Sequence, residues 1–279
     1  MELIDTHQHL ILRDRIGYAW TAEFAALRSG DFTRADYAAL TAGRGIVGTI
    51  FMETGVDDGD YQAEARMVAD MVGTGGMLGQ IASIRPETDE GFDAWLDEVV
   101  GLNVVGLRRI LHVVEDERSQ TETFRRNLRK IGARGLPFDL NFLARQLPIC
   151  EALLRACPDQ AYVLDHCGVP DVAAGAFDEW AAGIDLIAPF QNVVVKMSGI
   201  TTYCAPGTAS VALIRPYIER LLQAFGPDRM LWGGDWPVVN LGAGLPGWIG
   251  MTRELLAELT PDEQFAIGQG TARRVYRLD

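Results

Sequence analysis

Eight short apolar segments separated by helical patterns constrain the fold of this chain more than any other feature. Segments such as 46–52 and 193–197 are continuous, rich in β-branched residues and typical of strands that are buried on both faces of a parallel sheet. Amphipathic helical patterns lie between most of them. No GxGxxG motif follows the first segment, which disfavours a doubly wound nucleotide-binding sheet. The alternation therefore predicts an α/β protein with a (β/α)8 TIM-type barrel, formed as a single domain by residues 1–279.

The predicted elements follow from these patterns and from helix-start signals. After a first strand that begins at Leu3, we expect strands at 46–52, 78–84, 104–108, 136–141, 161–165, 193–197 and 230–235. Helices are expected at 34–44, 60–71, 91–100, 147–157, 177–189 and 214–225, with two more in the tail. A capping box at Ser119 to Glu122 predicts a further helix that runs to about residue 131. A second one, at Thr260, opens the last helix with Pro261 at its first position.

Composition excludes several classes of protein. The net charge is −13, from 25 basic and 38 acidic residues, which argues against nucleic-acid and anionic-membrane partners. The four cysteines form no CxxC pair, as expected of reduced thiols in the cytoplasm. The start lacks the pattern of a signal peptide, and no apolar run is long enough to span a membrane. We expect a cytoplasmic enzyme with a small-molecule partner, and a homo-oligomer is compatible with the sequence.

The first strand carries the most suggestive polar pattern, Asp5-Thr6-His7-Gln8-His9. Alternate side chains of a strand point to the same face. We therefore expect Asp5, His7 and His9 to share one side, with the two imidazoles close enough to hold one ion or one substrate.

The other histidines lie where a barrel places its chemistry. In a (β/α)8 barrel the active site is at the carboxyl ends of the strands. His7, His9 and His166 lie at predicted strand ends, and Asp235 ends the eighth strand. Three imidazoles and a carboxylate suit Zn²⁺ with a water in an open position, and the carboxylate would accept a proton from that water. For Asp235 the alternative is a helix N-cap, because Pro237 follows closely.

The remaining polar residues near strand ends are candidates for binding substrate. Only one of the adjacent Arg108 and Arg109 can point inward, and the apolar pattern does not decide which. The inward one would bind a carboxylate or an oxyanion. Lys196 lies in an apolar strand, where it either pairs with a carboxylate or binds substrate. Four further candidates are Tyr18 and Trp20, which either stack on substrate or anchor a loop, and His112 and Asn141.

Several motifs together resemble a known family. They are Asp5 to His9, Leu164-Asp165-His166-Cys167-Gly168, Val195-Lys196-Met197-Ser198-Gly199 and Gly234-Asp235-Trp236-Pro237, supported by Gly106 to Arg109, Tyr18-Ala-Trp20 and Gly270 to Arg273. In this order they resemble the amidohydrolase superfamily, and within it the branch of sugar-acid lactonases, such as L-fuconolactonase and L-rhamnonolactonase, and of 2-pyrone-4,6-dicarboxylate lactonase. The resemblance covers nearly the whole chain.

This resemblance implies a distorted barrel and hydrolysis of a lactone ester. It places His7, His9, His166 and Asp235 at the centre, with Asp235 handling protons, and Arg108 or Arg109 near the substrate. The fifth strand, Phe138 to Asn141, carries no histidine, and the fourth offers no bridging lysine or glutamate. Two metals are therefore disfavoured, and the expected cofactor is one divalent metal, zinc, or none. Without a metal, an arginine and the histidines would polarise the carbonyl while Asp235 activates water.

The expected function is that of a hydrolase in carbohydrate metabolism that opens a 1,4- or 1,5-aldonolactone. A neutral substrate suits an acidic protein with few basic residues at strand ends. The alternatives are a pyrone-dicarboxylate lactonase, which would need several converging arginines, a Zn-dependent aromatic-acid decarboxylase, and a catalytically silent sugar-binding barrel.

Overall fold

One eight-stranded parallel sheet forms the centre of the molecule in the computed structural model, which describes residues 1–278. Each strand pairs in parallel with the next one along the chain. The strands are β1 (Leu3–Gln8), β2 (Ile46–Met52), β3 (Met77–Ser83), β4 (Val104–Ile110), β5 (Phe138–Asn141), β6 (Tyr162–Leu164), β7 (Val193–Met197) and β8 (Met230–Trp232). This order confirms the predicted (β/α)8 barrel.

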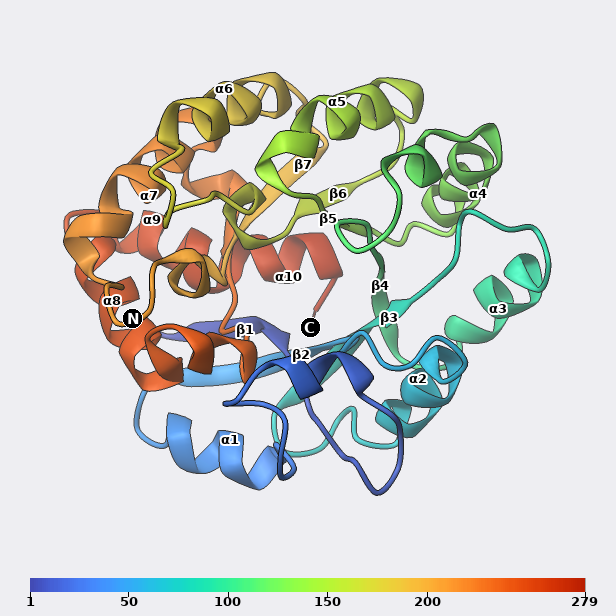
Figure 1. The fold of residues 1–279 in the computed structure, drawn as a ribbon, viewed down its shortest axis with the longest axis horizontal. Coiled ribbons are helices and arrows are strands. Elements are labelled where there is room, and N and C mark those ends of the chain that lie inside the picture. Colours follow the sequence, from blue (N-terminus) through green and yellow to red (C-terminus); the bar gives the residue numbers. More distant parts are fainter. Residues whose placement is uncertain (279) are drawn as a thin grey trace.

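Helices surround the strands, as Figure 1 shows, with the exception of the last one. Their apolar residues at helical spacing pack on the outer face of the sheet in one large core cluster. The helices are α1 (Arg34–Thr41), α2 (Tyr61–Ala69), α3 (Phe92–Val99), α4 (Glu122–Ala133), α5 (Leu147–Ala156), α6 (Phe177–Ile187), α7 (Val211–Phe225), α8 (Gly244–Leu255), α9 (Pro261–Phe265) and α10 (Thr271–Tyr276). None of the described helices combines the length and the apolar character that crossing a membrane requires.

The last helix, α10, lies inside the ring of strands (Figure 1). Its Ala272 and Tyr276 belong to a separate apolar cluster with residues that point into the barrel from six strands: Ile4, Ile50, Met52, Ile81, Val163, Val194 and Leu231. Most of these strand residues precede the polar residues of the same strands. The helix therefore closes the amino-terminal end of the barrel, and the polar chemistry lies toward the opposite end.

The ring is closed between β1 and β8 by isolated contacts. Within residues 1–278 the only bridge across this seam joins Gln8 to Trp236, which lies just beyond the end of β8. Around it, the N–H of Asp235 donates to the carbonyl oxygen of His7, and the N–H of His9 donates to that of Trp236, each at 2.8 Å. The barrel is thus distorted at the seam that carries the two histidines of β1.

The bounds of the predicted elements had mixed outcomes. Strands 46–52 and 193–197 have the predicted bounds. Thr260 forms the predicted capping box with Glu263. The box predicted at Ser119 is wrong: Ser119 lies in a 3-10 turn, and the N-cap of α4 is Thr121, whose hydroxyl accepts from the N–H of Phe124. Both residues have side-chain oxygens that can cap a helix, so spacing alone did not separate them.

Candidate active site

A cavity of about 800 Å³ opens at the carboxyl ends of the strands. Its inner wall includes His9, His166, Asp235 and Arg108, and its outer wall includes the side chain of Trp20. This is the end of a (β/α)8 barrel at which active sites are found. The cavity is within the size range of small-molecule sites.

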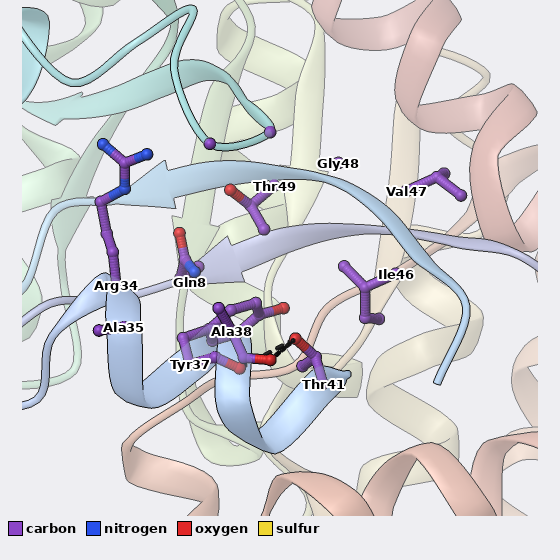
Figure 2. Close-up of a pocket in the computed structure, with 12 residues that line it drawn as sticks. Gln8, Arg34, Ala35, Tyr37, Ala38, Thr41, Ile46, Val47, Gly48 and Thr49 are labelled. Carbon is purple, nitrogen blue, oxygen red and sulfur yellow. Dashed lines mark hydrogen bonds between the residues drawn. The ribbon is translucent and has the colours of Figure 1, made fainter. Parts of the chain in front are cut away.

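A second cavity, of about 540 Å³, lies outside the barrel between α1 and the outer face of β1 and β2. Figure 2 shows Gln8 and Thr49 on the strand side of this cavity, with Tyr37 on the helix side. None of the residues that we predicted for the site lines it. The larger cavity is therefore the candidate active site.

Three histidines and one aspartate meet at the inner end of the larger cavity. The Nε2 atoms of His7 and His9 lie 3.8 and 3.5 Å from Oδ1 of Asp235. His166 lies with its ring centroid 4.4 Å from that of His7 and its Nδ1 4.0 Å from Oδ2 of Asp235. All four side chains are buried. The structure thus brings together the four residues that we predicted as metal ligands.

The backbone is distorted where it presents two of these residues. Among residues 1–278, six non-glycine residues have positive φ, and four of them follow β6 or β8: His166, Cys167, Val169 and Asp235. Such conformations cost of order 1–3 kcal/mol each and cluster at functional sites. Gly199 leaves room for the imidazole of His166, because a Cβ at position 199 would lie 2.6 Å from Nδ1 of that ring.

Hydrogen bonds orient the imidazoles. Nδ1 of His9 lies 2.9 Å from the carbonyl oxygen of Met52, which can only accept, so Nδ1 of a neutral ring carries the hydrogen and Nε2 keeps its lone pair. Nδ1 of His166 lies 3.0 Å from the hydroxyl of Ser198. Burial lowers the pKa of His166 to about 4 and that of His7 well below its usual value. Near pH 7 both rings are therefore neutral, which is the form that binds a metal.

The structure decides between the two adjacent arginines. Arg108 points inward, where its Nε donates to Oε1 of Glu53 at 2.7 Å and its Nη1 lies 3.3 Å from both Asp165 Oδ2 and His7 Nε2. Arg109 pairs instead with Glu87, 2.8 Å away, on the outer wall of the cavity. Both line the cavity, but only Arg108 reaches its inner end.

Lys196 lies beneath the histidines and is fully buried. Its Nζ is 2.6 Å from Asp139 Oδ2, 2.9 Å from Asp165 Oδ1 and 3.3 Å from His7 Nδ1. Lys196 does not line the cavity. Of the two roles that we considered for it, the structure supports pairing with carboxylates and places it out of reach of a substrate.

The donor set of this region fits one divalent cation. Among residues 1–278, four buried carboxylates of this region, on Glu53, Asp139, Asp165 and Asp235, face two buried cations, Arg108 and Lys196. Burial raises the pKa of Asp139 to about 7, so between one and two negative charges are left over near pH 7, and a divalent ion would balance them. The ligand atoms of His7, His9 and Asp235 lie within 4.8 Å of one another, and a second group of His7, Asp165 and His166 meets the same limit. Tetrahedral Zn²⁺ places ligand atoms about 3.3 Å apart, so the first group needs only small shifts.

The predicted substrate residues divide into two groups. Trp20, His112 and Asn141 line the cavity, and Nδ1 of His112 forms a short hydrogen bond with Oδ1 of Asn141. Tyr18 does not line it: the ring is buried in an apolar cluster under the loop, and its hydroxyl accepts from the N–H of Leu12. Of the two roles that we considered for Tyr18, the structure supports the loop anchor.

Asp5 does not share the side of His7 and His9, so this expectation is wrong. Its carboxylate accepts from the hydroxyl of Tyr37 at 2.6 Å and from the N–H of Gly234 at 2.7 Å, outside the barrel. The pairing of β1 with β2 shifts register between Asp5 and Gln8, which breaks simple alternation. Asp5 therefore supports the turn that precedes Asp235.

Sequence reasoning missed four residues of the site. Glu53 and Arg85 line the cavity directly after β2 and β3, and inspecting the ends of these two strands would have found them. Asp165 was part of a quoted motif but had no assigned role, although it contacts Arg108 and Lys196. Tyr203 lines the cavity from a 3-10 turn that no sequence signal marked.

Comparison with known proteins agrees with the class that this barrel and its centre define. The family model described as Amidohydrolase matches residues 4–278, so the chain belongs to the amidohydrolase family. It is 32% identical over 152 residues to an L-fucono-1,5-lactonase of Burkholderia ambifaria, spanning 53% of this chain and 52% of that protein. A Burkholderia multivorans protein of the same name is 25% identical over 287 residues, 99% of this chain and 96% of that one.

Among solved structures, an amidohydrolase of Burkholderia multivorans with bound Zn is similar in fold. Its TM-score is 0.87 at 24% identity, with both chains covered completely. The match includes the whole barrel.

Proposed function

We propose that this protein is a lactonase that opens a neutral 1,4- or 1,5-aldonolactone by attack of water on the lactone carbonyl. The observation that carries the proposal is the position of Asp235. Its carboxylate faces the cavity at the barrel end, beside two imidazoles whose Nε2 atoms lie 3.5 and 3.8 Å away. The names of the two lactonase relatives support the same chemistry.

In this proposal Asp235 is the general base. It takes a proton from a water that attacks the carbonyl carbon, and it returns the proton to the ring oxygen when the carbon–oxygen bond breaks. The guanidinium of Arg108, which lines the cavity, stabilises the negative charge that develops on the carbonyl oxygen. His166 lines the cavity beside Asp235, within reach of the same substrate.

A metal fits the same residues. His7, His9 and Asp235 would hold one Zn²⁺, with His166 close by, and the zinc in the similar Burkholderia multivorans structure is consistent with this. When bound, the ion supplies Lewis acidity to the carbonyl oxygen and to the water.

The arginines of the cavity favour a neutral substrate over a dicarboxylate. Each arginine in the wall already has a carboxylate partner at 2.7 to 2.8 Å: Arg85 with Asp58, Arg108 with Glu53, and Arg109 with Glu87. A dianion would have to compete with these carboxylates. We therefore rank the pyrone-dicarboxylate reaction second, although the cavity contains one more arginine than the sequence led us to expect.

The walls of the cavity are suited to a sugar ring. Trp20 is fixed by a hydrogen bond from Nε1 to the carbonyl oxygen of Thr54 and offers an aromatic face with Phe24. In the same cavity, His112 and Asn141 offer polar atoms for hydroxyl groups. An aromatic ring together with polar atoms suits a lactone that has both C–H groups and hydroxyl groups.

Proton release on a panel of lactones tests the proposal. The panel contains 1,4- and 1,5-aldonolactones and a pyrone dicarboxylate, each measured with and without a chelator, and an aromatic acid is assayed separately for carbon dioxide release. We expect acid from at least one aldonolactone. No acid from any aldonolactone would contradict the proposal, and turnover that a chelator leaves unchanged would remove the metal from it. Binding of an aldonolactone without turnover would instead support the silent sugar-binding barrel.

A further inference from the structure

The helix that closes the floor of the barrel reaches toward the active site through one side chain. Tyr276 of α10 is 2% exposed, and its ring lies under β4, where a Cβ on Gly106 would come within 3.2 Å of it. Its hydroxyl lies 3.0 and 3.2 Å from the two carboxylate oxygens of Asp139. A hydrogen bond that can reach both oxygens restricts how the carboxylate turns.

Asp139 in turn holds Lys196. The ammonium lies 2.6 Å from Asp139 Oδ2, which is its shortest contact with an acceptor among the described residues. The other two are Asp165 Oδ1 at 2.9 Å and His7 Nδ1 at 3.3 Å. Three contacts thus link the C-terminal helix to the imidazole of His7, and no solvent reaches any of the groups in between.

The position of Lys196 bears on which nitrogen of His7 carries its hydrogen. A neutral imidazole has one lone pair and one N–H. If Nδ1 accepts from Lys196, Nε2 must carry the hydrogen and turn it toward Asp235, since Nη1 of Arg108, 3.3 Å away, can only donate. If Nδ1 carries the hydrogen, the nearby carboxylate oxygen is Asp165 Oδ1 at 3.6 Å, and Nε2 presents a lone pair to the centre and to Arg108. Only the second form can bind a metal through Nε2.

We propose that Tyr276 is a positioning residue for the active centre: through Asp139 and Lys196 it sets which nitrogen of His7 carries the hydrogen. Tyr276 keeps the carboxylate of Asp139 in one orientation, and that carboxylate draws the ammonium of Lys196 toward β5 and away from His7. Loss of the hydroxyl frees the carboxylate to turn, so Lys196 moves toward Nδ1 and the share of His7 with hydrogen on Nε2 rises. Only the kinetic test of this proposal rests on the lactonase function proposed above.

The first test is nitrogen-15 NMR of the histidine side chains in the metal-free protein. There are four histidines in the sequence, and a His7→Gln variant identifies the signals of His7. Tyr276→Phe keeps the ring and removes only the hydroxyl. The matched control is Tyr162→Phe, because Tyr162 is 1% exposed and its hydroxyl donates to the carbonyl oxygen of Cys157 on the outer face of the sheet.

We expect the balance of His7 signals to move toward the form with hydrogen on Nε2 in Tyr276→Phe and to stay unchanged in Tyr162→Phe. The same His7 signals in wild type and Tyr276→Phe would overturn the proposal, as would equal changes in both variants.

The second test is kinetic. Tyr276→Phe should lower kcat by about tenfold and leave KM unchanged, in the range of effects seen for residues that orient a site's ligands. Asp139→Asn should lower kcat further, and the double variant should match Asp139→Asn alone, because both changes act along one path. If the loss of kcat in the double variant equalled the product of the two single losses, Tyr276 and Asp139 would not act through the same contacts. If wild type hydrolyses no lactone, the proposed function fails, whereas the NMR test still decides the role of Tyr276.

Discussion

The N–H of Asp235 donates a 2.8 Å hydrogen bond to the carbonyl oxygen of His7. The proposed general base is therefore joined to a proposed metal ligand by the main chain, at the seam where β8 meets β1. Their side chains meet in the same place, with His7 Nε2 3.8 Å from Asp235 Oδ1. The contacts that close the barrel therefore also bring the side chains of His7 and Asp235 together.

We predict that Asp235→Asn lowers kcat on the preferred lactone by more than about 10²-fold, because the amide cannot take the proton. The backbone bond to His7 remains, so the urea midpoint should stay close to that of wild type. Asp93→Asn is the control, since this carboxylate lies on the exposed face of α3 and pairs with Lys130. Near-normal turnover in Asp235→Asn would show that another group is the base.

Gly199→Ala should disturb His166. The added methyl would lie 2.6 Å from Nδ1 of His166, at a residue with φ of +65°. Gly207→Ala is a matched control, because Gly207 has φ of +75° but no atom within 4 Å of an added Cβ. Both variants should lose about 1–2 kcal/mol of stability from the backbone conformation alone. We expect kcat to fall only in Gly199→Ala, and equal kcat in the two would mean that His166 is free to move aside.

The two adjacent arginines should differ in stability measurements. Arg108→Met leaves the buried Glu53 without its partner, and breaking a buried pair in this way typically costs about 3–5 kcal/mol. Arg109→Met should cost less, since Glu87 is only partly buried and keeps Arg118 at 3.6 Å. Urea unfolding of both variants at pH 7 compares them. A smaller loss in Arg108→Met than in Arg109→Met would contradict the inward position.

Glu64 should make stability depend on pH. Burial raises the pKa of its carboxyl from 4.5 to about 8, with the negative charge of Glu53 adding to the effect. Below pH 4.5 the carboxyl is neutral in both states. Above it the unfolded chain releases the proton and the folded protein keeps it until about pH 8, so the stability that Glu64 contributes falls across this window.

Glu64→Gln removes the titration and keeps an oxygen that accepts from the N–H of Thr54. Relative to wild type, the variant should gain stability as pH rises from 5 to 8 and change little above that. Urea unfolding at several pH values measures the difference. A difference that is independent of pH would show that Glu64 titrates normally.

The metal proposal predicts one Zn²⁺ per chain. His9→Gln should weaken Zn²⁺ binding by more than about tenfold, since it removes a ligand whose Nε2 faces the centre. His112→Gln should not, because His112 bonds to Asn141 and belongs to neither candidate ligand group. Titration with a chromophoric chelator measures both affinities. Equal Zn²⁺ affinities of the two variants would show that His9 is not a ligand, so that any bound ion lies elsewhere.

The sequence predicted a residue's position correctly where that position depends only on the strand that carries it. The strand at 193–197 is so apolar and β-branched that only a buried strand suits it, and the strand-end rule then found His166 and Asp235 without knowledge of their contacts. Because a barrel brings all strand ends together, four distant residues could be placed in one centre.

Prediction from the sequence failed where a contact between two elements decides which way a side chain points. The register shift that follows Asp5 in β1 places His7 on the side opposite Asp5, and nothing local marks it. Whether Arg108 or Arg109 points inward depends on Glu53, which lies on another strand. Tyr276 reads as an ordinary residue of a last helix, and only the fold shows that this helix enters the barrel.

The plug made by α10 has a consequence for synthesis on the ribosome. The centre draws His7 from β1 and Asp139 from β5, yet the floor beneath them includes Tyr276 of α10, far later in the chain. A nascent chain therefore carries these histidines without a sealed barrel around them until α10 has been made. We expect chains truncated before α10 to be cleaved by proteases faster than the full sequence, because the apolar floor of their barrel stays open.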